Sequence, residues 1–236
     1  MHDSRFPPPR ADSSYRPVPL TFGVAYHGWS FQIRFQAKRT TRAHEKAENL
    51  RTYLSGRRHQ HSADENAFPY GDWTGPYRSA DGRSALTALY GGSFDLLLGR
   101  RTYDLWSNYW PQAPSGPMSD PLNAATKYVA THRPESLQWG PYEAVGADLV
   151  EGVQRLKSQD GANLILWGSS TLTSPLLAAD LVDEVVLFLY PVLLGTGKRF
   201  FADGTAPRSL EPVSTTTTPS GVTLMILRPS GGLKAT

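Results

Sequence analysis

Hydrophobic and polar positions between residues 164 and 200 follow an order that predicts a strand, a turn, a helix and a second strand. Residues 164–167 are apolar, Gly168 and Ser169 provide the turn, a helical stretch follows, and residues 185–190 are apolar again. A strand that leads through a Gly-Ser turn into a helix exposes backbone N–H groups at the positive end of the helix dipole, which favours an anion. This segment therefore indicates a nucleotide-cofactor site in an α/β protein.

The same alternation of apolar strands and helical stretches extends through the chain from residue 68. Apolar runs predict strands over residues 94–98, 127–131 and 222–227, and the pattern predicts helices over residues 84–90, 102–110 and 149–157. Strands that alternate with helices indicate an α/β fold in which a central, mostly parallel sheet has helices on both faces.

The first part of the chain lacks this order. Prolines make residues 1–19 irregular, and residues 20–36 alternate only weakly, so that they are candidates for strand pairing. The expected organisation is an irregular basic extension over residues 1–48, a folded domain over residues 49–230 and a tail over residues 231–236.

Charge is unevenly distributed, although the formal net charge is only +3. Residues 1–62 carry 11 Lys/Arg and 4 Asp/Glu, a net of +7, whereas residues 63–236 carry 13 and 17, a net of −4. A basic arm that touches nucleic acid and a solvated extension are both open interpretations. The solvated extension is favoured, so no nucleic-acid partner is expected.

Composition excludes several kinds of protein. The 236 residues include no cysteine, which excludes disulfides, thiolate zinc sites and a cysteine nucleophile. The chain has no run of 18 apolar residues and no apolar signal core, so we expect no membrane partner, no secretion and a cytoplasmic location. His44, His59 and His61 have no suitably spaced acidic partner, so no metal is expected.

A second motif ends the apolar run at residues 94–98. Gly99 permits close approach of the backbone to a ligand, and Thr102 can cap the helix expected to begin there. Arg100 and Arg101 offer planar donor groups that suit a phosphate monoester. The alternative is an ordinary strand–helix turn with surface arginines.

Together these residues resemble the reductase domain of riboflavin biosynthesis proteins, which has the dihydrofolate-reductase-like fold. The resemblance covers roughly residues 64–229 and rests on three further elements besides the Gly-Arg-x-Thr segment. They are Gly168-Ser169, Leu181-Val182-Asp183-Glu184 and the Pro-x-x-x-Gly element over residues 191–195.

The resemblance implies NADPH as the cofactor. In the family the Gly-Arg-x-Thr segment grips the 2′-phosphate, the turn after the central strand cradles the pyrophosphate, and the end of the neighbouring strand lines the adenosine. The implied cofactor-binding residues are Gly99, Arg100, Arg101, Thr102, Thr131, His132, Gly168, Ser169, Ser170, Thr171 and Leu172.

The segment from Trp73 to Tyr77 resembles the Trp-x-x-Pro-Tyr element of stand-alone members of this family, where it borders the substrate pocket. Aromatic rings there suit a flat pterin-like or pyrimidine ring. Trp73, Tyr77, Trp106 and Phe201 are the substrate candidates, with core packing an equal interpretation for Trp106.

Two departures limit what the resemblance implies. Riboflavin-pathway reductases usually carry Glu-Gly-Gly where this chain has Trp167-Gly168-Ser169. The family's first strand resembles residues 49–55, but the Ser-x-Asp-Gly that should follow is absent, so no catalytic residue can be named. Together with the change in charge near residue 62, this absence suggests that residues 1–62 are a frame-shifted or mis-started segment. The alternative is that the segment is native.

The expected function is an NADPH-dependent reductase that transfers hydride to a small heterocycle, similar to the ribosylaminopyrimidine reductases of riboflavin biosynthesis or to dihydrofolate reductases. The alternative is a non-catalytic nucleotide-binding protein of the same fold. A homodimer is expected because residues 185–190 and their neighbours supply more apolar surface than one sheet face needs, and because relatives pair this way.

Overall fold

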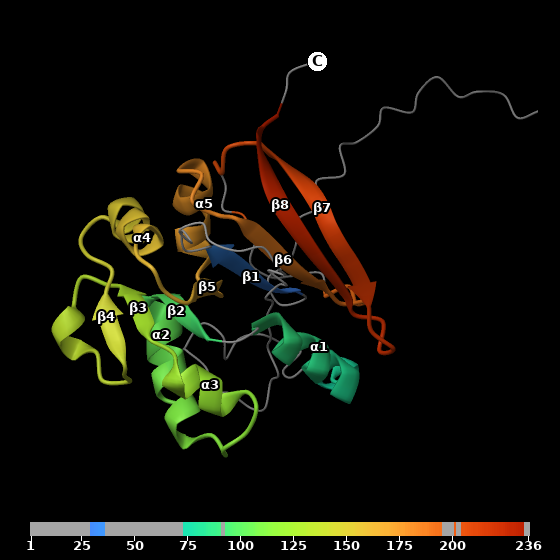
Figure 1. Ribbon diagram of the computed structural model, residues 1–236. Coiled ribbons are helices and arrows are strands. Elements are labelled where there is room, and N and C mark those ends of the chain that lie inside the picture. The colour runs from blue at the N-terminus through green and yellow to red at the C-terminus, as the bar shows by residue number, and fades with distance from the viewer. Residues whose placement is uncertain (1–28, 36–72, 91–92, 195–200, 202–203, 234–236) are drawn as a thin grey trace, which may run out of the picture.

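The computed structural model describes residues 29–35, 73–90, 93–194, 201 and 204–233. At its centre is an eight-stranded sheet with the strand order β4-β3-β2-β5-β1-β6-β8-β7 (Figure 1). The strands are β1 (Trp29–Phe35), β2 (Phe94–Gly99), β3 (Lys127–Ala130), β4 (Tyr142–Ala144), β5 (Asn163–Trp167), β6 (Glu184–Leu189), β7 (Arg208–Thr217) and β8 (Thr223–Gly232). The α-helices are α1 (Ala80–Tyr90), α2 (Arg100–Ser107), α3 (Ser119–Ala124), α4 (Leu149–Ser158) and α5 (Ser170–Ala178). Short 3-10 turns occur at η2 (Gly75–Tyr77), η3 (Trp110–Gln112) and η4 (Pro134–Ser136).

The sheet divides into two halves. In the parallel half, β4, β3, β2 and β5 pair in parallel. In the antiparallel half, β1 runs opposite to its neighbours β5 and β6, and β8 runs opposite to its neighbours β6 and β7. All strands except β1 and β8 therefore point in one direction, and the parallel sheet that the sequence predicts is found in β4, β3, β2 and β5.

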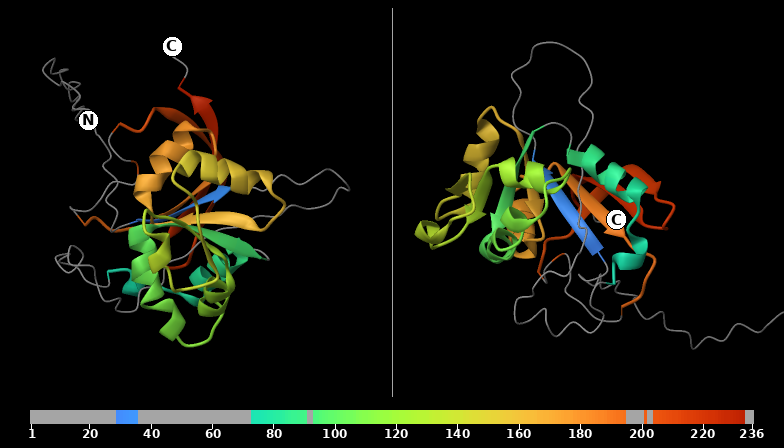
Figure 2. Two further views of the ribbon diagram at one scale, coloured as in Figure 1. Left: turned by 90° about the vertical axis from the view of Figure 1, so that its left-hand side faces the viewer. Right: turned by 90° about the horizontal axis from the view of Figure 1, so that it is seen from below.

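Helices cover both faces of the sheet because the strand residues alternate between two cores. In β5, Ile165 and Trp167 join a core that includes Tyr103 of α2, whereas Leu164 and Leu166 join a core that includes Leu176 of α5. Figure 2 shows α4 and α5 on one side of the sheet and α2 and α3 on the other. The predicted fold class, a three-layer α/β fold of the dihydrofolate-reductase-like type, is confirmed.

Strand β1 lies inside the segment that the sequence assigns to an irregular extension. Trp29 pairs with Leu189 of β6, and Phe35 pairs with Leu164 of β5, so these seven residues join the two halves of the sheet. The expectation of an irregular segment is therefore wrong for residues 29–35, whereas the weak alternation over residues 20–36 is matched by a strand. The proposed domain boundary at residue 49 lies outside the described residues.

Other boundaries move by a few residues. Helix α1 begins at Ala80, earlier than expected, and α2 ends at Ser107, with η3 supplying the next turn. Strand β8 extends to Gly232 and so includes the start of the expected tail. Strands β4 and β7 and helix α3 are additional elements that the hydrophobic pattern does not single out.

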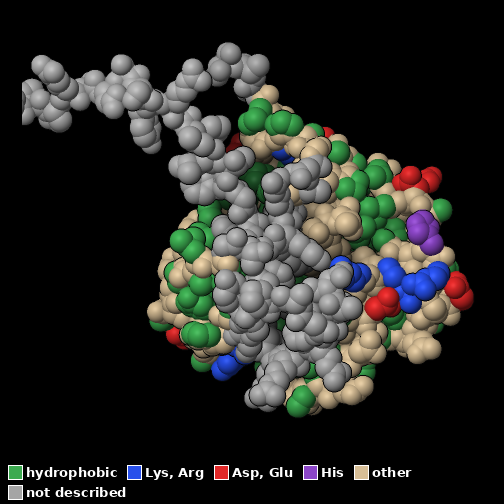
Figure 3. All heavy atoms as spheres, turned by 180° about the vertical axis from the view of Figure 1, so that it is seen from behind, with side chains coloured by type: hydrophobic (Ala, Val, Ile, Leu, Met, Phe, Trp, Pro, Cys, Tyr) green, Lys and Arg blue, Asp and Glu red, His purple; other side chains and the backbone are tan. Residues whose placement is uncertain are grey.

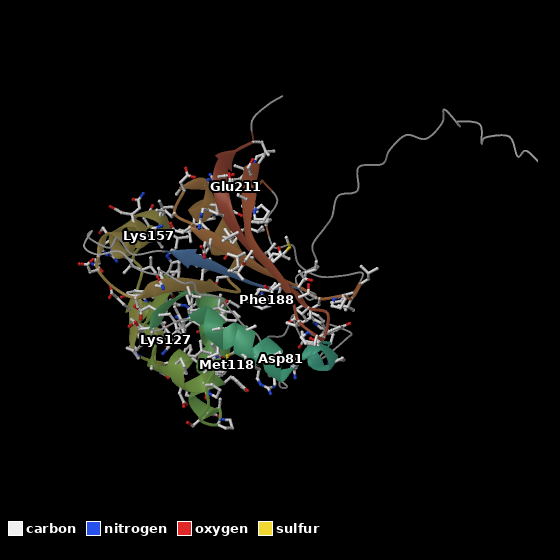
Figure 4. The ribbon with its side chains drawn as sticks, turned by 45° about the vertical axis from the view of Figure 1, so that its right-hand side comes forward. Asp81, Met118, Lys127, Lys157, Phe188 and Glu211 are labelled. Atoms are coloured by element: carbon white, nitrogen blue, oxygen red, sulfur yellow. The ribbon has the colours of Figure 1, made fainter. Side chains whose placement is uncertain are left out.

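A lysine is fully buried in the parallel half. The Nζ of Lys127 donates to the carbonyl of Asn123 at 2.6 Å and lies 4.3 Å from the centre of the Trp139 ring. Burial lowers the pKa of Lys127 to about 8, although the nearby Asp95 carboxylate acts to raise it. Figure 4 shows Lys127 on the α2–α3 side of the sheet and Lys157 on the α4 side.

Among the described residues, no helix is long and apolar enough to cross a membrane.

Candidate functional site

The candidate site lies where two neighbouring parallel strands continue into helices on opposite faces of the sheet. Strands β2 and β5 are parallel neighbours, but β2 continues into α2 on one face and β5 into α5 on the other. Ligands of open α/β sheets bind at the carboxyl ends of strands at such a switch point. The two predicted glycine turns, at Gly99 and Gly168, end these two strands.

Ser169 locks the two turns together. Its Oγ accepts a hydrogen bond from the Gly99 backbone N–H at 2.8 Å, donates to the Trp167 carbonyl at 3.1 Å and lies 3.1 Å from the Thr102 Oγ1. A Cβ on Gly99 would lie only 3.1 Å from this Oγ. A side chain at position 99 would therefore crowd Ser169, which is 5% exposed and whose hydroxyl joins the two loops.

Both helices at this edge begin without a side-chain cap. Helix α2 has Gly99 as its N-cap, and α5 has Ser169, whose side chain makes no capping hydrogen bond. Thr102 is the third residue of α2, so the expectation that it caps this helix is wrong. First-turn N–H groups without a side-chain cap are the groups that bind phosphate at helix N-termini.

The remaining residues of the Gly168 turn have distinct environments. Gly168 has φ of +60°, a left-handed conformation that favours glycine. Ser170 is half-buried and Thr171 is exposed, whereas Leu172 packs against the core shared with α4 and α5. Ser170 and Thr171 thus present polar side chains at the start of α5.

Four further predicted cofactor-binding residues follow β2 and β3 and lie at this edge of the sheet: Arg100, Arg101, Thr131 and His132. Arg100 is held by a carboxylate: its Nε lies 2.8 Å from Oδ1 and 2.9 Å from Oδ2 of Asp104. Arg101 and His132 are exposed and Thr131 is half-buried. Figure 3 shows Lys or Arg side chains gathered beside a histidine, and His132 is the one histidine among the described residues.

An aromatic pocket lies in the antiparallel half, between α1 and the sheet. The ring of Tyr190, just after β6, makes edge contacts with Trp73 at 5.0 Å and with Tyr77 at 5.7 Å between ring centres. Tyr77 and Tyr190 line a cavity of about 50 Å³ whose other walls include Phe188 and Leu224. Figure 4 shows Phe188 close to the start of α1, where Asp81 is labelled.

Tyr190 lines this pocket, although the sequence did not single it out. Burial raises the pKa of Tyr190 to about 12, against a lowering effect of Arg78. The residue ends an apolar run, and that pattern predicts a core strand. The available signal was its position directly before Pro191 at the carboxyl end of the strand.

The other two aromatic candidates lie elsewhere. Trp106 packs edge-on against Trp167 at 5.5 Å and against Trp110 at 5.8 Å, which favours the core-packing interpretation. Phe201 packs against the core on the opposite face of the sheet. The structure thus groups Trp73 and Tyr77 with each other but not with Trp106 or Phe201.

Trp167 stands where riboflavin-pathway reductases carry glutamate. It is 1% exposed, and its indole Nε1 has no hydrogen-bond partner among the described residues. The same residues contain no group of three or more His, Asp or Glu side chains that could hold a metal ion.

The sequence model of the RibD C-terminal domain family matches residues 72–224, and the chain belongs to this family. Two curated proteins of Bacillus subtilis (strain 168) are similar to it. YyaP is 29% identical over 140 residues, which cover 58% of this chain and 74% of YyaP. YwjB is 26% identical over 130 residues, which cover 55% of this chain and 70% of YwjB. Both relatives are described as uncharacterized.

Two solved structures are also similar. A putative riboflavin biosynthesis protein from Shewanella sp. PV-4 aligns with a TM-score of 0.47 and 17% identity, over 67% of this chain and 87% of that protein. A pyrimidine reductase-like protein from Corynebacterium diphtheriae aligns with a TM-score of 0.43 and 16% identity, over 66% of this chain and 84% of that protein.

Proposed function

We propose that this protein is an NADPH-dependent reductase that transfers hydride to a small heterocyclic substrate. The observation that carries the proposal is the joining of the Gly99 and Gly168 turns by Ser169 at the carboxyl ends of β2 and β5. Membership of the RibD C-terminal domain family supports it, because the family is associated with reductases.

The two turns would hold the dinucleotide. The uncapped first turn of α5, with Ser170 and Thr171, fits the pyrophosphate, and the loops after β2 and β3 fit the adenosine end. When bound, the cofactor supplies the hydride, and the protein positions the two reactants and excludes water.

The substrate would lie against the aromatic pocket of the antiparallel half. Strands β5 and β6 are separated only by β1 and point in the same direction, so Tyr190 after β6 and the Gly168 turn after β5 lie at the same edge of the sheet. Trp73 and Tyr77 offer ring faces and edges to a flat pyrimidine or pterin ring. We propose that the proton comes from water.

The apolar surface that suggested a homodimer is covered within the single chain. Val185 packs in the core under α4 and α5, whereas Val186 and Phe188 pack in the core on the other face. A homodimer remains part of the proposal through the likeness to paired relatives, and sedimentation at micromolar concentration tests it.

Nucleotide titration followed by turnover assays tests the proposed function. We expect saturable NADPH binding and oxidation of NADPH in the presence of a ribosylaminopyrimidine or a dihydropterin. Binding without oxidation of any such substrate would favour the non-catalytic alternative. Failure to bind either NADPH or NADH would refute the proposal.

A further inference from the structure

Two buried tryptophans of one aromatic cluster differ in how their indole N–H groups are satisfied. Trp139 and Trp167 both pack against Trp106, and both are buried. The Nε1 of Trp139 donates to the Oδ1 of Asn123 at 2.9 Å, whereas the Nε1 of Trp167 meets no acceptor in the part of the chain that the structure describes. A buried donor without an acceptor destabilises a fold, and such groups in native proteins often mark a functional contact.

The Trp167 side chain lies between α2 and the aromatic pocket. On the side of the parallel half, its ring centre is 5.5 Å from that of Trp106. It also belongs to the same core as Phe188 and Tyr190, which line the aromatic pocket of the antiparallel half. The unsatisfied donor is therefore on the face of the sheet that carries the proposed substrate pocket.

The register of the strands makes the edge of the sheet stepped at Trp167. Gln32 of β1 pairs with Trp167 on one side and with Val186 of β6 on the other, so these two residues lie at the same level. Strand β5 ends at Trp167, whereas β6 continues beyond Val186 and is followed by Tyr190. A flat ring that packs against Tyr190 would thus have the end of β5, with its indole N–H, beside it.

The chemistry of the indole restricts the ligand group that can satisfy it. An indole N–H donates a hydrogen bond and accepts none, whereas an ionised carboxylate, such as the glutamate that riboflavin-pathway reductases carry at this position, only accepts. A ring amino group directed at Trp167 would place one donor against another. A ring carbonyl oxygen would give the buried N–H its acceptor.

We propose that the indole N–H of Trp167 donates to a ring carbonyl oxygen of the substrate and thereby selects an oxo-substituted heterocycle over an amino-substituted one. The selection rests on the proposed function and narrows its substrate class to flat rings with an oxo group on the edge that faces the end of β5. Trp167 is a specificity residue in this arrangement, and the hydride still comes from the cofactor.

The binding of two small rings tests the selection. Uracil carries ring carbonyls at the positions where 2,4-diaminopyrimidine carries amino groups. Trp167→Phe keeps an aromatic ring but removes the N–H, so it should weaken uracil binding about 5- to 50-fold, on the scale of a hydrogen bond left unpaired in a buried site. The affinity for 2,4-diaminopyrimidine should change less than about twofold. Equal changes for the two rings, or no binding of uracil by the wild type, would overturn the proposal.

Trp139→Phe is the matched control, because it removes a buried indole N–H that is already paired within the fold. It should leave the ratio of the two ring affinities at the wild-type value. If this control lowered the ratio as much as Trp167→Phe does, loosening of the aromatic cluster would explain the effect, and the proposal would fail.

Nuclear magnetic resonance of the indole N–H groups tests the contact in the wild-type protein. The resonance of Trp167, identified by its loss in Trp167→Phe, should move downfield when uracil is added, while that of Trp139 stays in place. A Trp167 resonance that is already at a hydrogen-bonded position in the free protein would show that water or another part of the chain satisfies the donor. A shift caused by NADPH alone would assign the donor to the cofactor. Either result would overturn the proposal.

Turnover assays separate this selection from the proposed function. If the wild type showed the uracil preference and the shift of the Trp167 resonance but oxidised NADPH with no substrate, the proposed function would fail and the selection by Trp167 would stand. If the wild type oxidised NADPH and Trp167→Phe kept the wild-type ring preference, the selection would fail and the proposed function would stand.

Discussion

The parallel and antiparallel halves of the sheet fix their connections in different ways. In the parallel half, loops distant in sequence are tied by buried or half-buried side chains, such as Ser169 to Gly99 and Arg100 to Arg133. In the antiparallel half, β7 and β8 are joined by a short turn, and the Thr217–Thr223 hydroxyl contact across them is exposed. Parallel strands need long crossovers, so their loops depend on side chains, whereas a hairpin holds its own ends. The side chains that hold the loops of the parallel half are polar, and they lie at the loops where the proposed ligand would bind.

The largest effect is expected from separating the halves. A chain that begins at Asn49 lacks β1, so β5 and β6 each lose their shared partner. We expect this truncated protein to lose its cooperative urea transition, measured by circular dichroism. A chain that begins at Trp29 keeps β1 and is the control. A cooperative transition in the shorter chain would show that β5 and β6 hold together without this strand.

The second effect comes from Lys127 in the parallel half. An unfolded lysine keeps its proton up to about pH 10.5, whereas folded Lys127 loses it near pH 8. The unfolded chain therefore binds more protons between these values, and the free energy of unfolding should rise there by roughly 1–3 kcal/mol. Urea titrations at pH 7 and pH 10 measure the rise, and Lys127→Met should abolish it.

Tyr190 gives the opposite dependence in the antiparallel half. Its folded pKa of about 12 lies above the unfolded value of 10.0, so the folded chain binds more protons in this window. Stability should therefore fall as the pH rises from 10 to 12. Tyr190→Phe should reduce the fall while keeping the rise due to Lys127; the fall that remains is due to Tyr128 of β3, whose pKa is also raised by burial. A single monotonic curve in the wild type would contradict the opposite effects of Lys127 and Tyr190.

Replacing one positive-φ glycine in each half of the sheet compares how the two halves tolerate a change of the backbone. Gly168 at +60° lies in the parallel half, and Gly231 at +98° lies in β8 with open space around its missing side chain. Gly168→Ala and Gly231→Ala should each lower the free energy of unfolding by about 1–2 kcal/mol. Only Gly168→Ala should also weaken NADPH binding, by tenfold or more, as measured by titration. Equal nucleotide affinities in both variants would remove Gly168 from the site.

The smallest effects come from single hydroxyl groups. Ser169→Ala leaves the Gly99 N–H without its partner and should cost about 1–2 kcal/mol of stability. Thr217→Ala removes an exposed hydroxyl contact and should change stability by less than about 0.5 kcal/mol. Thermal unfolding of both variants measures the difference. A similar cost for the two would mean that the loop contact in the parallel half is no more important than the exposed one.

Local chemistry explains which features the sequence predicts. The turns at Gly99 and Gly168 follow from short apolar runs that end in glycine, and both are found at strand ends. The contacts of Arg100 do not follow from any local pattern, because its partners Arg133 and Ser136 are 33 and 36 residues away. The direction of β1 is also beyond the pattern, since apolar–polar alternation is the same for either direction.

A second limit of the sequence predictions concerns which aromatic side chains are buried in the core and which line a pocket. Tyr190 ends an apolar run that predicts core, and it both packs against the core and lines the aromatic pocket. The sequence leaves substrate contact and core packing as equal interpretations for Trp106, and its ring packs on Trp167. The sequence indicates that these residues are aromatic and amphipathic, but only the fold decides which ring faces a ligand.

The aromatic cluster beside the Gly168 turn has an optical consequence. Four of the six tryptophans, Trp106, Trp110, Trp139 and Trp167, lie in one cluster, with ring centres 5.5 Å to 6.5 Å apart in the contacts that Trp106 makes. Indole emission overlaps the absorption band of a reduced nicotinamide, and Trp167 immediately precedes Gly168. Energy transfer from this cluster should quench the intrinsic fluorescence when a reduced dinucleotide arrives, so occupancy of the site can be followed without a label.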